Sequence, residues 1–161
     1  MTRSLDINPY VLECHEGQRF ELLGAVVVVK AGTEQTGGKF NLFEVACPAG
    51  FATPLHIHYA EDVAVFILEG SLTVFWGDEQ MQAAAGSYLF QPRGTPHGFR
   101  VSGSASARVL YLCIPAGFDQ FIQERVQLAD NSQAMVTAAR YKIEILGPLP
   151  DGSEEKNTTL G

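Results

Sequence analysis

Two histidines separated by one residue, His56 and His58, mark the part of the sequence best suited to chemistry. On an extended backbone alternate side chains point to the same face, so both imidazole rings would face one side. A third histidine, His97, follows the turn sequence PRGTP, which would hold its ring in place. Imidazole is a common ligand of transition metals, and three convergent rings can hold one ion. We therefore predict a site for one divalent transition metal (Fe, Ni, Mn, Zn or Cu) at His56, His58 and His97.

The segments that must position these histidines are short and rich in β-forming residues. From about residue 19 to residue 115, runs of Val, Ile, Leu, Phe and Tyr are separated by turns that contain Gly, Pro or Asp. Short strands at nearly regular spacing, without helices between them, are typical of antiparallel sandwiches and barrels. The sequence therefore predicts an all-β barrel core over 19–115.

The pattern changes after Pro115, where apolar residues recur at a helical interval. These residues are Phe118, Phe121, Ile122 and Val126. We expect a short α-helical C-terminal extension over about 117–146, packed on the outside of the barrel or covering its mouth. The polar residues 151–161 are predicted to form a flexible tail. The length of 161 residues suits one domain, so residues 1–161 are expected to form a single unit.

Composition and charge exclude two classes of binding partner. The net charge of -7 and the scattered basic residues argue against nucleic acid, because phosphate binding needs concentrated Lys and Arg. The apolar runs are too short to cross a bilayer, and the first residues lack the basic-then-apolar layout of a signal peptide. We therefore expect a cytoplasmic protein that binds a small molecule and has no membrane partner.

The spacing of glycine, proline and histidine resembles the two signatures of the cupin superfamily. The first signature is carried by Gly50, His56, His58 and Gly70, and the second by Gly86, Pro92, Arg93, Gly94 and His97. The 15 residues between Gly70 and Gly86 are typical of single-domain microbial members. This resemblance implies a double-stranded β-helix, or jelly-roll, barrel with the metal inside, and often a homodimer.

Longer segments resemble a bacterial group related to quercetin dioxygenases, in which a cupin barrel precedes a short helical tail. They are TGGKFNLFEVACPAGFATPLHIHYAEDVAVFILEG, PRGTPHGFR, IPAGFDQFI and ILGPLP. Enzymes of this type use a divalent metal, bound by three histidines and usually one glutamate, to open a flavonol ring with dioxygen. The resemblance therefore implies the ligand role for His56, His58 and His97, residue by residue.

The glutamate of the first signature is not matched, because Val63 occupies its position, with six residues between it and Gly70. Asp62 fits a shorter spacing, but adjacent residues of a strand face opposite sides. Glu61 has the right parity, but we expect it to lie in the turn. We therefore predict that the carboxylate ligand is absent and that an apolar substrate pocket takes its place. The predicted pocket residues are Val63, Phe90, Phe99 and Tyr111.

Three functions are compatible with this site. A three-histidine metal site could serve a dioxygenase of the quercetinase-like type that acts on a small organic molecule. Loss of the glutamate charge would leave a more Lewis-acidic metal, suited to an anionic substrate. In the alternative, the barrel binds a small molecule without metal and without catalysis. A metal-dependent isomerase or lyase is the third.

Overall fold

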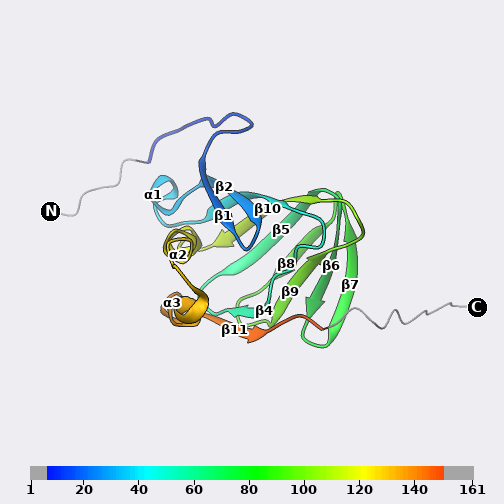
Figure 1. The fold of residues 1–161 in the computed structure, drawn as a ribbon. Helices are drawn as coiled ribbons and strands as arrows, with labels where there is room; N and C mark the ends of the chain where they lie inside the picture. Colours follow the sequence, from blue (N-terminus) through cyan, green and yellow to red (C-terminus); the bar gives the residue numbers. More distant parts are fainter. Residues whose placement is uncertain (1–6, 151–161) are drawn as a thin grey trace, which may run out of the picture.

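The computed structural model describes residues 7–150, which form two antiparallel β-sheets facing each other, with helices at one end (Figure 1). This arrangement confirms the predicted all-β jelly-roll architecture with a short helical segment near its C-terminal end. The predicted flexible tail, 151–161, lies outside the described residues.

The first sheet has six strands in the order β1-β2-β3-β10-β5-β8. Their bounds are β1 (Gln18–Leu22), β2 (Ala25–Ala31), β3 (Asn41–Cys47), β10 (Ala107–Ile114), β5 (Asp62–Glu69) and β8 (Tyr88–Gln91). A short helix, α1 (Thr33–Thr36), connects β2 to β3. Because β10 pairs with both β3 and β5, strands far apart in the sequence become neighbours, as a jelly roll requires.

The second sheet has five strands in the order β11-β4-β9-β6-β7. Their bounds are β11 (Ile143–Gly147), β4 (Leu55–His58), β9 (His97–Val101), β6 (Ser71–Trp76) and β7 (Glu79–Ala84). All three predicted metal ligands lie on β4 and β9, which are adjacent strands of this sheet. The sheet therefore forms the wall of the barrel that carries the candidate site.

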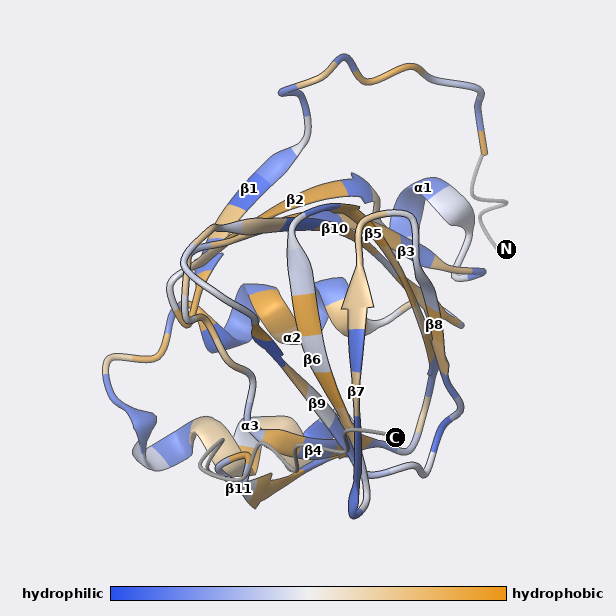
Figure 2. Cartoon of the chain, turned by 90° about the vertical axis from the view of Figure 1, so that its right-hand side faces the viewer, coloured by the Kyte–Doolittle hydropathy of each residue, from blue (hydrophilic) through white to orange (hydrophobic). Residues whose placement is uncertain are grey.

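The core lies between the sheets and follows the two-residue period of the strands. Along β5, Val63, Val65 and Ile67 are buried, whereas Phe66 between them is exposed. Figure 2 shows hydrophobic bands along β6 that are separated by paler bands near the middle of the hydropathy scale. Inward-facing apolar side chains from both sheets thus meet in one core, which fixes the strand register.

The C-terminal extension contains helices α2 (Phe118–Arg125) and α3 (Ala134–Arg140), with a 3₁₀ turn, η1 (Asn131–Gln133), between them. Both helices lie at one end of the barrel (Figure 1), and residues from both line its cavity, so they cover the mouth. The chain then returns to the barrel as β11, where Ile143 pairs with His58. The extension is therefore not helical up to residue 146, because the alternating Ile143 and Ile145 complete the sheet.

Among residues 7–150, no helix combines the length and apolar character needed to span a bilayer.

Candidate metal centre

The three predicted histidines come together through two features of the second sheet. His56 and His58 are two residues apart on β4, so their rings lie on the same face. His97, the first residue of β9, is the direct pairing partner of His56 across the two strands. One nitrogen from each of the three rings lies within 4.8 Å of the others. The structure therefore assembles the predicted cluster from one strand pair.

Backbone carbonyl groups fix two of the rings. The Nδ1 atom of His56 lies 2.8 Å from the Pro54 carbonyl oxygen, and that of His97 lies 2.8 Å from the Thr95 carbonyl oxygen. Because a carbonyl oxygen can only accept, Nδ1 is the donor in each neutral ring. The lone pair is then on Nε2, which is the atom left to bind a metal.

A buried carboxylate fixes the third ring. The His58 Nδ1 atom donates to Glu61 Oε1 at 2.7 Å, and both residues are buried. Glu61 lies in the turn before β5, as expected, but its side chain points inward and orients a candidate ligand. Its position three residues after His58, just before β5, is the signal in the sequence that could have indicated this role. A carboxylate behind a ligating histidine is a common arrangement in metal sites.

The unpaired nitrogens of the cluster suit a metal ion. In the described part of the chain, Nε2 of His58 and Nε2 of His97 are buried and have no hydrogen-bond partner. A buried polar atom without a partner costs about 1–3 kcal/mol, and a coordinated metal would remove that cost. Burial, reinforced by the neighbouring rings, lowers the pKa of His56 to about 3 and that of His97 to about 4. Both rings are therefore neutral at pH 7, the form that binds metals.

Position 63 offers the cluster no carboxylate. Val63 is fully buried on the inner face of the barrel, between Gln91 and Cys113 on the neighbouring strands. Asp62 points the other way and pairs with Arg93, whose guanidinium lies 3.1 Å from it and lowers the pKa of the Asp62 carboxyl. Among residues 7–150, the group of potential ligands consists of the three histidines.

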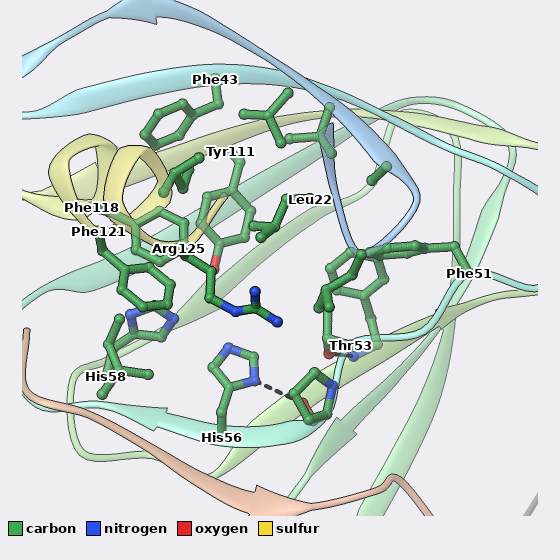
Figure 3. Close-up of a pocket in the computed structure, with 18 of the residues that line it drawn as sticks. Leu22, Phe43, Phe51, Thr53, His56, His58, Tyr111, Phe118, Phe121 and Arg125 are labelled. Atoms are coloured by element: carbon green, nitrogen blue, oxygen red, sulfur yellow. Dashed lines mark hydrogen bonds between the residues drawn. The ribbon is translucent and has the colours of Figure 1, made fainter. Parts of the chain in front are cut away.

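A cavity of about 550 Å³ opens beside the rings of His56 and His58 (Figure 3). Its walls are mostly apolar and come from both sheets and from α2. The aromatic lining residues are Phe43, Phe51, Phe99, Tyr111, Phe118 and Phe121. An apolar cavity with a few convergent polar groups is the usual form of a small-molecule site.

The predicted pocket residues have different positions in the structure. Phe99 and Tyr111 line the cavity, whereas Val63 is buried but does not line it. Phe90 is 51% exposed, because its neighbours on β8, Leu89 and Gln91, take the inward positions. The prediction that Phe90 lines the pocket was therefore wrong, because adjacent residues of a strand face opposite sides and Phe90 faces outward.

Several of the cavity residues that sequence reasoning missed belong to the extension. Phe118, Phe121 and Arg125 of α2 line the cavity. The Phe118 ring also contacts His58 edge to face, with the ring centroids 5.2 Å apart. Helical periodicity predicted α2, but it could not show which end of the barrel the helix covers.

The family comparison agrees with this geometry. Residues 43–115, which include all three histidines, match the family model described as "Cupin domain". This segment is therefore a cupin domain. The match covers the barrel strands from β3 to β10 and ends before α2. The helical cover of the cavity thus lies outside the matched segment.

Similar proteins support the same assignment. The chain is 31% identical to quercetin 2,3-dioxygenase of Bacillus subtilis over 103 residues, which are 64% of this chain and 31% of that protein. It is 30% identical to an uncharacterised protein of Methanocaldococcus jannaschii over 79 residues, which are 49% of this chain and 63% of the relative. The chain therefore spans less than two thirds of either relative. The solved structure of KdgF from Halomonas sp. shares the fold, with a TM-score of 0.62, 19% identity, and coverage of 70% of this chain and 99% of that one.

The buried state of His97 predicts acid sensitivity of the metal-free protein. The pKa of His97 falls from 6.5 to about 4 on folding, so the unfolded chain takes up the proton first. The free energy of unfolding should therefore decrease as the pH falls from about 6.5 to about 4. His97→Gln should remove its share of this decrease, at most about 1.4 kcal/mol per pH unit, in denaturant titrations across that range. His15→Gln, at an exposed histidine, is the matched control and should keep the natural slope. An unchanged slope in His97→Gln would contradict this account.

The contact between Glu61 and His58 predicts an indirect effect on metal affinity. Glu61→Ala removes the acceptor that orients the His58 ring, so the affinity should fall about 10- to 100-fold in competition with a chelating indicator. Glu61→Gln keeps an acceptor oxygen and should lose less metal affinity than Glu61→Ala. Asp62→Asn is the control, because Asp62 pairs with Arg93 away from the cluster. Equal affinity in Glu61→Ala and the natural protein would show that this contact plays no part in metal binding.

Proposed function

We propose that this protein binds one divalent transition metal through His56, His58 and His97 and acts on a small organic molecule in the adjoining cavity. The leading reaction class is that of a quercetinase-like dioxygenase. The observation that carries this proposal is the convergence of three imidazoles with their Nδ1 atoms already engaged. Similarity to a bacterial quercetin 2,3-dioxygenase supports the reaction class.

The residues around the cluster would have different roles in such a reaction. A metal bound there would supply a Lewis acid with open coordination positions. Glu61 and the two backbone carbonyls hold the rings in place, and the aromatic walls exclude water from the substrate. Val63 cannot take a proton, so this site offers no general base where other members of the superfamily have one. Substrates that are already ionised at neutral pH, such as acidic 1,3-dicarbonyls, therefore suit it better than a flavonol that must first be deprotonated.

A non-catalytic binding module without metal is the second candidate. The observation that favours it is Val63, which leaves an apolar side chain where a carboxylate ligand is expected. In this case the histidines would be hydrogen-bonding groups at the floor of a ligand cavity.

We further propose that the protein forms a homodimer through the outer face of its first sheet. Phe66, Tyr88 and Phe90 are all more than 40% exposed there, at 42%, 64% and 51%. They lie on the paired strands β5 and β8, where Phe66 is directly opposite Tyr88. Burial of such neighbouring aromatic side chains favours association.

The cytoplasmic location stays a prediction.

Metal analysis separates the two candidate functions. Protein purified without chelator or added metal should contain about one Fe, Ni, Mn, Zn or Cu ion per chain by elemental analysis. His56→Ala should lower this content and abolish oxygen uptake with an acidic 1,3-dicarbonyl compound. His15→Ala, outside the cluster, should change neither. A sub-stoichiometric metal content that His56→Ala leaves unchanged would favour the binding module.

Restoring a carboxylate at position 63 tests whether that position faces the metal. Val63→Glu should lower the free energy of unfolding of the metal-free protein by about 3 kcal/mol or more, because it buries an unpaired carboxyl. Added metal should then raise the melting temperature of this variant more than that of the natural protein. Val65→Glu, at the next inward position of β5, should be destabilised without this additional gain. Equal metal-induced shifts in the natural protein and Val63→Glu would place position 63 out of reach of the site.

A further inference from the structure

One permanently charged side chain enters the apolar cavity. Arg125, the last residue of α2, is among the lining residues together with His56 and Tyr111. Figure 3 shows its guanidinium group pointing into the cavity on the side of these two rings. Every other residue that lines the cavity is apolar, a neutral polar residue or a histidine. Arg125 is half-buried and its hydrogen bond to Asn131 is exposed, so its charged group borders both the cavity and the solvent.

The charge of Arg125 is not balanced within the described chain. Three other arginines form ion pairs, namely Arg93, Arg108 and Arg140. The hydrogen bond recorded for Arg125 runs from Nη2 to the neutral amide oxygen Oδ1 of Asn131, at 2.8 Å. No carboxylate in residues 7–150 lies within ion-pair distance of Arg125. Its positive charge and most of its N–H donors therefore remain available.

The helix that carries Arg125 is fastened to the barrel. The buried side chain of Asn41 accepts hydrogen bonds from the backbone N–H groups of Gly117 and Asp119, at 2.9 and 3.3 Å. The Asp119 carboxylate in turn accepts from the backbone N–H of Thr33 at 2.8 Å. These contacts fix the start of α2, so its last residue is held over the cavity before any ligand arrives. Such preorganisation lowers the entropic cost of binding.

Tyr111 supplies a second donor to the same cavity. Burial raises the pKa of its phenol well above the usual value, so the hydroxyl group keeps its proton at neutral pH. Figure 3 shows the hydroxyl directed toward the interior of the cavity. A guanidinium and a phenol donor beside apolar walls form a recognition site for a planar anionic oxygen group.

We propose that Arg125 is a specificity-determining residue that selects organic acids, by pairing with a carboxylate whose apolar body fills the cavity. The inference deepens the proposed function, on which it rests in taking this cavity as the substrate site. It requires no metal, since the charge that attracts the anion belongs to the chain. It also agrees with Val63, because a ligand that arrives as an anion needs no base to ionise it.

The test compares two probes with the same apolar body, 2-naphthoate and its neutral amide, 2-naphthamide. Isothermal titration calorimetry on the full chain should show that Arg125→Gln weakens 2-naphthoate binding at least about tenfold, while the affinity for 2-naphthamide stays within about twofold. Arg125→Lys keeps the positive charge but lacks the planar guanidinium group. Its affinity for 2-naphthoate should therefore lie between those of the natural protein and Arg125→Gln. Arg140→Gln is the matched control, because it removes the same charge from the same extension but lies outside the main cavity.

The titrations are made on protein as purified and again after chelator treatment, which separates this inference from the metal site. An Arg125 effect that persists after chelation supports anion selection even if the protein proves to hold no metal. Unchanged 2-naphthoate affinity in Arg125→Gln would overturn the inference. An equal loss for both probes would also overturn it, because Arg125 would then only support the shape of the cavity.

Discussion

Hydrogen bonds that the Nδ1 atoms of three imidazoles donate are the constraint on which the rest of the site depends. They set the tautomer of each ring and so decide that the Nε2 atoms converge. Each acceptor comes from a different local structure: a carbonyl before β4, a carbonyl before β9 and the buried carboxylate of Glu61. The pairing of His56 with His97 then brings the rings to one point. Turns and strand register act together here, and neither would be sufficient alone.

The electrostatics of the cavity differ from those of the whole protein. The chain carries a net charge of -7, yet among residues 7–150 its cavity is lined by no carboxylate and by one arginine without an ion-pair partner, Arg125. The two acids that follow His58 in the sequence do not offset the charge of Arg125, because Glu61 accepts a hydrogen bond from His58 and Asp62 pairs with Arg93. Without a carboxylate at position 63, a bound divalent ion would add to the positive potential. Both features favour an anionic ligand with an apolar body.

The C-terminal extension forms one wall of the cavity. The helix α2 covers the mouth, and β11 pairs with β4, the strand that carries two of the histidines. The segment that matches the cupin family ends at residue 115, so the covering residues lie beyond it. The three histidines thus lie in the segment that matches the family, whereas the lining residues Phe118, Phe121 and Arg125 belong to the extension.

The sequence by itself determined the barrel, the three histidines and the valine at position 63. These features depend on local spacing and on the two-residue period of strands, both of which can be read along the chain. The same period failed by one residue at Phe90, because a strand of four residues has too few positions to fix its parity. Only the tertiary structure decided that Glu61 turns inward to His58 and that Arg125 enters the cavity. These contacts depend on how a turn and a helix pack against the barrel, which no local pattern encodes.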